Sequence, residues 1–172
     1  MAEPHAVLNA LDTRGAFQAL QRCCGSHRWV EGMLRLRPFA STSTLMESAD
    51  TVWRGLARAD YLEAFAHHPA IGADVAKLRE KFASTAGWSS QEQAGVQSAN
   101  EDTLLALRDG NVEYRDKFGY VFLVCATGKS ADEMLALLQA RLPNAADDEL
   151  RIAAAEHEKI TRIRLAKLED KP

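Results

Sequence analysis

Apolar residues recur three and four positions apart through most of this chain, and that spacing places them on one face of an α-helix. Leu150, Ala154 and His157, for example, follow this spacing in the last such pattern. Residues that begin helices separate successive patterns, among them Ser130 and Glu133, which have the spacing of a capping box. About eight helical patterns follow one another, so we expect an all-α fold, an irregular bundle and not a simple four-helix one.

One apolar run does not follow the helical spacing. Tyr120–Ala126 is continuously apolar, and Thr127-Gly128-Lys129-Ser130 comes directly after it. A strand followed by Gly-Lys-Ser is the setting of a phosphate-binding loop, but that motif also requires a glycine five residues before Gly128. Leu123 occupies that position, so the sequence argues against a nucleotide site. Upstream, Asp109-Gly110 is a turn signal, and we expect a break between two helical segments there.

Composition restricts the partners and the compartment. The chain has 172 residues, of which 47% are hydrophobic, so we expect one well-buried core and a single domain over residues 1–172. With 21 basic and 24 acidic residues the net charge is −3, which argues against a nucleic-acid or membrane partner and favours a small-molecule or protein partner. No leader or membrane span is evident, and the three cysteines lack a metal-ligand spacing. We therefore expect a cytoplasmic protein whose cysteines are reduced, buried small hydrophobes.

Two adjacent histidines stand at the end of one helical pattern. Pro69 disfavours the helical conformation of the residue before it, so we expect His68 to leave the helix and to lie at a rim. A cation at a helix C-terminus is stabilised by the helix dipole, so the pair His67-His68 also has a purely structural explanation. A zinc site is a weak alternative, because these histidines and His157 lack the two-histidine spacing of the helical zinc motif.

A carboxylate and an amide, Glu92 and Gln93, open a later helical pattern. Ser89 and Ser90 precede them at capping-box spacing. On pattern alone, a role as cap partners is the more economical explanation of this pair, and a catalytic role is the alternative.

A set of short motifs occurs in one order along nearly the whole chain. The motifs are Leu8-Asn9, Trp29-Val30, Arg37-Pro38-Phe39, Phe65, His68-Pro69-Ala70-Ile71-Gly72, Glu92-Gln93, Tyr114, Lys117-Phe118-Gly119, Phe122, Gly128-Lys129, Arg141-Leu142, Asn144, Glu149-Leu150, Glu158-Lys159-Ile160 and Arg164-Leu165. In order and gaps they resemble the 2-oxo-4-hydroxy-4-carboxy-5-ureidoimidazoline (OHCU) decarboxylases. The resemblance implies an all-α homodimer that converts OHCU to (S)-allantoin and carbon dioxide, the last step of urate oxidation to allantoin.

The resemblance also implies roles for individual residues. It places the catalytic histidine on His68 and the active-site carboxylate on Glu92. The implied substrate-binding residues are Pro69, Gln93, Phe122, Leu123, Val124 and Arg164. Arg162 lies two residues from the last of these and remains an alternative to it. Neither a metal nor an organic cofactor is implied.

These residue types suit a decarboxylation. The ring C=N bond beside the carboxylated carbon can accept the electron pair, so the protein has to orient the carboxylate, stabilise charge and deliver a proton. Arg164 offers a two-pronged donor, and either His68 or Glu92 can deliver the proton, a choice that the sequence leaves open. Two other functions stay open as well: hydrolysis or isomerisation of a related ureido compound, and a catalytically silent scaffold in the urate pathway.

Overall fold

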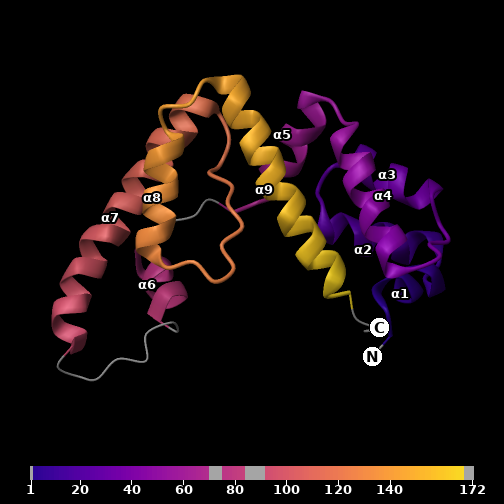
Figure 1. Cartoon of the computed structure of the whole chain (residues 1–172), viewed down its shortest axis with the longest axis horizontal. Helices are drawn as coiled ribbons and strands as arrows, with labels where there is room; N and C mark the ends of the chain where they lie inside the picture. The colour runs from indigo at the N-terminus through magenta and orange to yellow at the C-terminus, as the bar shows by residue number, and fades with distance from the viewer. Residues whose placement is uncertain (1, 70–74, 84–91, 169–172) are drawn as a thin grey trace. The chain divides into compact units, whose positions relative to one another are not determined.

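The computed structural model of the chain is all-α, as the sequence predicts (Figure 1). It describes residues 2–69, 75–83 and 92–168, with the main chain alone at 78, 81–83 and 92–100. Within these ranges lie nine helices and no strand: α1 Pro4–Ala10, α2 Thr13–Cys23, α3 His27–Arg35, α4 Thr42–Arg54, α5 Arg58–Ala66, α6 Val75–Ala83, α7 Glu92–Phe118, α8 Ala131–Arg141 and α9 Ala146–Ala166. None of the helices described is both long and apolar enough to pass through a membrane.

The chain divides into two compact units. The first comprises Met1–His67 and Ala154–Pro172, and the second comprises His68–Ala153. Helix α9 contributes its first turns to the second unit and the rest of its length to the first. Each unit has a buried apolar core of its own. The single domain expected from chain length stays a prediction.

Two tryptophans organise the core of the first unit. Trp29 of α3 and Trp53 of α4 are buried, and their indole N–H groups donate to the carbonyls of Ala49 at 3.1 Å and Ala154 at 2.9 Å. The ring of His157 on α9 stacks on Trp53 with centroids 4.5 Å apart. A buried indole supplies a large apolar area and one donor that needs a partner. These contacts therefore fix α3, α4 and the later turns of α9 around one core.

Helices α7 and α8 pack closely in the second unit. Helix α7 continues without interruption through Asp109-Gly110, so the predicted break is wrong. A Cβ at Gly110 would lie 2.7 Å from Cδ2 of Leu138 on α8. Glycine inside a helix costs about 1 kcal/mol relative to alanine, and the close approach of Leu138 offsets that cost. The capping box of α8 is confirmed, since Glu133 N–H donates to Ser130 Oγ at 3.2 Å and Ser130 N–H to Glu133 Oε2 at 2.8 Å.

The apolar run Tyr120–Ala126 is extended, and it pairs with no strand in the described part of the chain. Gly119, with a φ of 82°, ends α7 before it, and Gly128, with a φ of 76°, follows it. Glycine adopts this left-handed region at little cost, so the chain can turn sharply at both ends of the run. A buried extended segment without a partner strand must satisfy its main-chain groups by other means. Arg141, the last residue of α8, satisfies one of these groups, the carbonyl of Leu123.

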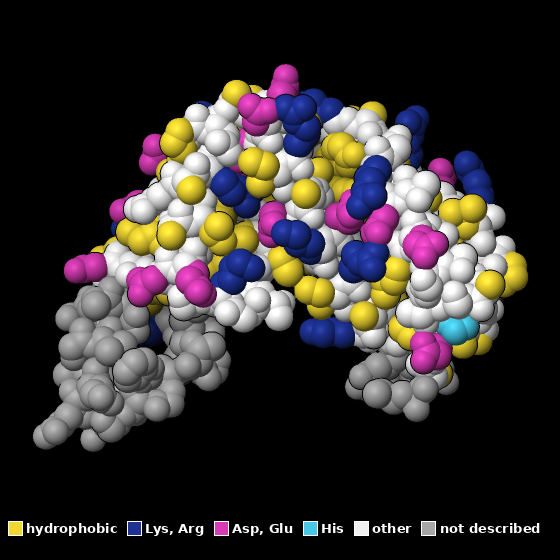
Figure 2. Space-filling model, viewed as in Figure 1, with side chains coloured by type: hydrophobic (Ala, Val, Ile, Leu, Met, Phe, Trp, Pro, Cys, Tyr) yellow, Lys and Arg dark blue, Asp and Glu magenta, His cyan; other side chains and the backbone are white. Residues whose placement is uncertain are grey.

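Charged side chains of both signs are interspersed on the described surface in view (Figure 2). Basic side chains on that face have acidic neighbours and do not form a continuous stripe.

Candidate functional site

The histidine predicted to be catalytic lies just beyond the end of α5. The helix ends at Ala66, and His67 is its C-cap, with its N–H donating to the carbonyl of Ala64 at 3.2 Å. His68 follows in a bend and is half-buried, whereas Pro69 is exposed. The expectation that His68 leaves the helix before proline is confirmed.

Glu92 and Gln93 are the first two residues of α7. Their main chain is described, whereas their side chains are not, and Ser89 and Ser90 lie outside the described residues. The choice between a catalytic role and a capping role for Glu92 therefore stays open. Both residues are helical and lie at the N-terminal end of the described part of α7.

A buried arginine holds the segment that carries Phe122, Leu123 and Val124. Arg141, the last residue of α8, is only 7% exposed. Its Nη1 donates to the carbonyl of Leu123 at 2.6 Å, and its guanidinium lies 4.6 Å from the centroid of the Phe122 ring. No hydrogen bond joins the main chain of Phe122 or Val124 to another described residue. The carbonyl of Leu123 is thus occupied, and Arg141 fixes the middle of the extended segment.

Arg141 is paired with an equally buried carboxylate. Glu149, in the first turn of α9, is fully buried, and its Oε1 accepts from Nε and Nη2 of Arg141 at 2.8 and 2.5 Å. The hydroxyl of Tyr114 donates to the same oxygen at 2.5 Å, and Asn144 Nδ2 donates to Oε2 at 2.9 Å. Both oxygens of the carboxylate are bonded, which a buried ion pair requires. We call Tyr114, Arg141, Asn144 and Glu149 the buried network.

Tyr114 joins the buried network to α7. Burial raises the pKa of its phenol, the hydrogen bond to Glu149 raises it further, and Arg141 opposes part of the increase. The phenol therefore stays protonated and remains a donor. Its ring lies 4.6 Å from that of Phe118 and 5.2 Å from that of Phe122, measured between centroids. The network thus connects α7, α8 and the start of α9 around the extended segment.

The two candidate arginines of α9 have different partners in the first unit. Nη1 of Arg162 lies 2.5 Å from Oδ2 of Asp50, which ties it to α4. Arg164 is exposed, and its Nη1 makes long contacts with the carbonyls of Arg22 at 3.4 Å and Cys23 at 3.5 Å, at the end of α2. A ligand would have to break an ion pair to engage Arg162, but only weak hydrogen bonds to engage Arg164. Of the two arginines, Arg164 therefore has the weaker contacts within the described part of the chain.

The cysteines of the first unit are structural, as the sequence predicts. Cys23 and Cys24 are buried, and burial raises the pKa of their thiols to about 11 and about 12. Because both thiols stay protonated near neutral pH, they are poor nucleophiles.

Across the described residues, no group of three or more His, Cys, Asp or Glu side chains could hold a metal ion.

The buried network has no role in the sequence-based interpretation, although all four of its residues occur in the motifs that carry the resemblance. A signal was present, because Arg141 lies three and four residues after the apolar Leu138 and Leu137, and Glu149 lies four residues before the apolar Ala153. Charged residues at apolar positions are rarely buried unless paired. A charged residue at an apolar position is therefore a candidate for a buried ion pair, but its spacing does not show which residue is its partner.

Comparison with known proteins gives concordant results. The sequence model of the family described as OHCU decarboxylase matches residues 9–166. The uric acid degradation bifunctional protein TTL of Arabidopsis thaliana is 35% identical, over 85% of this chain and 45% of that protein. The 2-oxo-4-hydroxy-4-carboxy-5-ureidoimidazoline decarboxylase of Haloferax volcanii is 26% identical, over 92% of each. A crystal structure of OHCU decarboxylase in the presence of (S)-allantoin matches with a TM-score of 0.68 and 32% identity, over 86% of this chain and 94% of that one.

The lengths of these relatives differ. The chain spans 45% of the Arabidopsis protein and 31% of the bifunctional protein PucL of Bacillus subtilis. The family match, in contrast, extends over most of this chain, from residue 9 to residue 166. The chain therefore belongs to the OHCU decarboxylase family.

Proposed function

We propose that this protein converts OHCU to (S)-allantoin and carbon dioxide without a cofactor, as the last step of urate oxidation to allantoin. The observation that carries the proposal is the family match over residues 9–166. The similarity to an OHCU decarboxylase crystallised in the presence of (S)-allantoin supports it, because that match combines 32% identity with 94% coverage of the solved chain.

In this proposal His68 and Glu92 handle the proton. Loss of the carboxylate moves an electron pair into the ring C=N bond of the substrate, and a proton then has to reach one face of the planar intermediate. A histidine titrates near neutral pH and can bind and relay that proton. The half-buried position of His68 beyond the helix end supports this role. Glu92 is the second candidate donor, and the choice between the two stays open.

The other proposed residues bind and orient the substrate. The guanidinium of Arg164 binds an anionic or ureido oxygen of the substrate through two N–H groups. The amide of Gln93 and the main chain of Phe122 and Val124 pair with the ureido and ring carbonyl groups. The remaining two, Pro69 and Leu123, contribute by fixing the chain beside these groups. Fixed binding of this kind accelerates a reaction that needs orientation more than it needs a reactive side chain.

We further propose a cytoplasmic homodimer in which residues 1–172 form a single domain. The continuous family match across both compact units supports the single domain. The dimer rests on the family resemblance. Light scattering during size-exclusion chromatography is expected to give twice the chain mass of 18.9 kDa, and a particle with the mass of one chain would contradict the dimer.

Replacement of Arg164 by Gln is expected to lower kcat/KM ~10²-fold, since it removes a charged donor from the developing charge. Arg162→Gln is the matched control, because it breaks the ion pair with Asp50 and should leave kcat/KM within about threefold, at a cost of up to ~1 kcal/mol in the free energy of unfolding. Steady-state kinetics and urea unfolding of both variants check this. Loss of turnover in Arg162→Gln alone would assign the substrate contact to Arg162 instead.

Release of carbon dioxide separates the proposed function from its alternatives. OHCU is generated in the cuvette from urate by the two upstream activities, and carbon dioxide is measured with and without a chelator. A cofactor-independent decarboxylase accelerates carbon dioxide release equally with and without the chelator. Consumption of OHCU without carbon dioxide would indicate hydrolysis or isomerisation, no consumption above the spontaneous rate would indicate a silent scaffold, and loss of activity with chelator would indicate a metal enzyme.

A further inference from the structure

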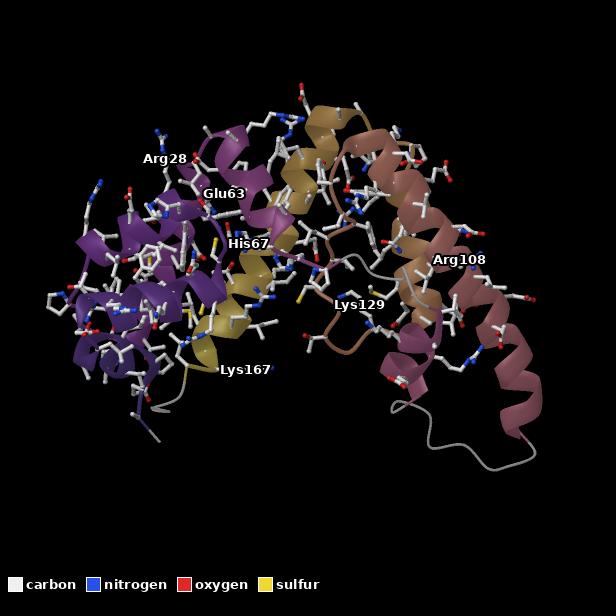
Figure 3. The ribbon with its side chains drawn as sticks, turned by 180° about the vertical axis from the view of Figure 1, so that it is seen from behind. Arg28, Glu63, His67, Arg108, Lys129 and Lys167 are labelled. Atoms are coloured by element: carbon white, nitrogen blue, oxygen red, sulfur yellow. The ribbon has the colours of Figure 1, made fainter. Side chains whose placement is uncertain are left out.

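The end of α5 lies against the short connection between α2 and α3, within the first unit. Glu63 of α5 accepts a hydrogen bond from the main-chain N–H of His27, at the start of α3, at 3.1 Å. One turn earlier, Asp60 lies 3.9 Å from Arg28. Figure 3 labels Arg28, Glu63 and His67 in this part of the molecule. Carboxylates are favourable at a helix N-terminus, so these contacts hold the last turns of α5 against the connection.

Gly25 lies in that connection and is buried beneath the side chain of His67. A Cβ at Gly25 would lie 2.4 Å from Cδ2, 2.5 Å from Cγ and 2.8 Å from Cβ of His67. Cγ and Cδ2 are ring atoms that a change of rotamer can move, but Cβ is bonded to the main chain, so the overlap at 2.8 Å remains in every rotamer. The φ of Gly25 is not positive, so glycine is needed here for space and not for its backbone freedom. Any side chain at residue 25 has to displace His67.

We propose that Gly25 is a positioning residue that sets the place of His68 through His67. His67 is the C-cap of α5, and His68 is the next residue. The peptide bond between them is planar and of fixed length, so a shift of the His67 main chain is passed directly to His68. A misplacement of about 1 Å in a reacting group can cost ~10²-fold in rate. The inference rests on the proposed function, in which His68 is the reactive histidine.

Three variants and one control test the proposal. Gly25→Ala adds the methyl group, His67→Gly removes the side chain that it meets, and the double variant does both. Glycine is chosen at 67 because His67 Cβ itself would lie 2.8 Å from the added methyl. Gly55→Ala is the matched control in the same unit, since a Cβ there would have no neighbour nearer than 3.6 Å.

We expect Gly25→Ala to lower kcat ~30- to 100-fold, and His67→Gly, which loosens the chain before His68, to lower it ~3- to 10-fold. The double variant should match His67→Gly and not the product of the two effects, because the overlap is gone. Gly55→Ala should leave kcat unchanged. A Gly25→Ala enzyme with the kcat of the wild type, or a double variant as slow as the product, would overturn the proposal.

The imidazole NMR signals of His68, assigned by their loss in His68→Ala, give a readout that does not need turnover. We expect them to shift in Gly25→Ala, to return to the His67→Gly position in the double variant, and to stay unchanged in Gly55→Ala. Unchanged signals in Gly25→Ala would overturn the proposal. A wild-type protein that does not accelerate decarboxylation would refute the proposed function and leave this test valid. If Gly25→Ala does not fold, the His68 signals of the His67→Gly variant provide the test. A shift of these signals from their wild-type positions would support the proposal, and unchanged signals would overturn it.

Discussion

Replacement of His68 by Ala is expected to abolish the acceleration of carbon dioxide release and to leave the fold intact. A group that transfers a proton in the transition state contributes roughly 10²- to 10⁴-fold, so the rate should fall close to that of the spontaneous reaction. His68 lies beyond the end of α5 and is half-buried, outside the fully buried core. The thermal unfolding midpoint should therefore move by less than ~4 °C, the shift that 1 kcal/mol causes in a chain of this size. Steady-state turnover and calorimetry of the variant measure the two effects.

His67→Ala is the control for that prediction. It keeps the main-chain cap of α5 and the Cβ that rests on Gly25, so kcat should fall by less than about tenfold, far less than the loss of an acid–base group causes. An inactive His67→Ala protein beside an active His68→Ala protein would show that the reactive histidine has been misassigned.

Glu149→Gln is expected to cost ~3–5 kcal/mol in the free energy of unfolding, because it leaves the buried charge of Arg141 without its partner. Activity should fall as well, since Arg141 holds the carbonyl of Leu123 in the extended segment that carries Phe122 and Val124. Urea unfolding monitored by tryptophan fluorescence gives the stability, and kcat/KM gives the activity.

A surface ion pair in the same unit is the control for the buried network. Nη2 of Arg79 and Oε1 of Glu101 are 2.5 Å apart, the same separation as in the Arg141–Glu149 pair, but both side chains are at least half exposed. Glu101→Gln should therefore cost less than ~1 kcal/mol. Equal losses in Glu101→Gln and Glu149→Gln would contradict this expectation, because Glu149 is buried and also accepts hydrogen bonds from Tyr114 and Asn144, whereas the Arg79–Glu101 pair is exposed.

A double replacement separates stability from positioning. Arg141→Met with Glu149→Leu removes both buried charges, and such exchanges are often neutral or stabilising. We expect this variant to recover most of the stability lost in Glu149→Gln and to remain slow, because it lacks the guanidinium that anchors the carbonyl of Leu123. Recovery of full kcat/KM would show that the network serves stability alone.

Local signals in the sequence predicted those elements that depend on local interactions. The capping box of Ser130 and Glu133 acts within one turn, and the effect of Pro69 acts on the adjacent His68, so both are confirmed. The break at Asp109-Gly110 was wrong because a contact distant in sequence overrides the local signal. Leu138 fills the space that the missing side chain of Gly110 leaves, and the helix continues.

In the predicted site too, contacts between residues distant in sequence could not be predicted from local signals. The contact that distinguishes Arg162 from Arg164 is an ion pair with Asp50, 112 residues away from Arg162, and spacing on one helix cannot show that partner. The buried network likewise joins α7, α8 and α9 to the carbonyl of Leu123 through side chains whose burial follows only from the packed fold. Ser89 and Ser90 lie outside the described residues, so whether they cap the helix that Glu92 opens stays a prediction.

Circular dichroism of the product shows whether this protein forms (S)-allantoin from OHCU. OHCU is generated from urate in the cuvette, and the ellipticity of allantoin is followed with and without the protein. We expect rapid formation of optically active (S)-allantoin, faster than the spontaneous reaction, which gives a racemic product without net ellipticity. A trace that coincides with the protein-free control would contradict the claim.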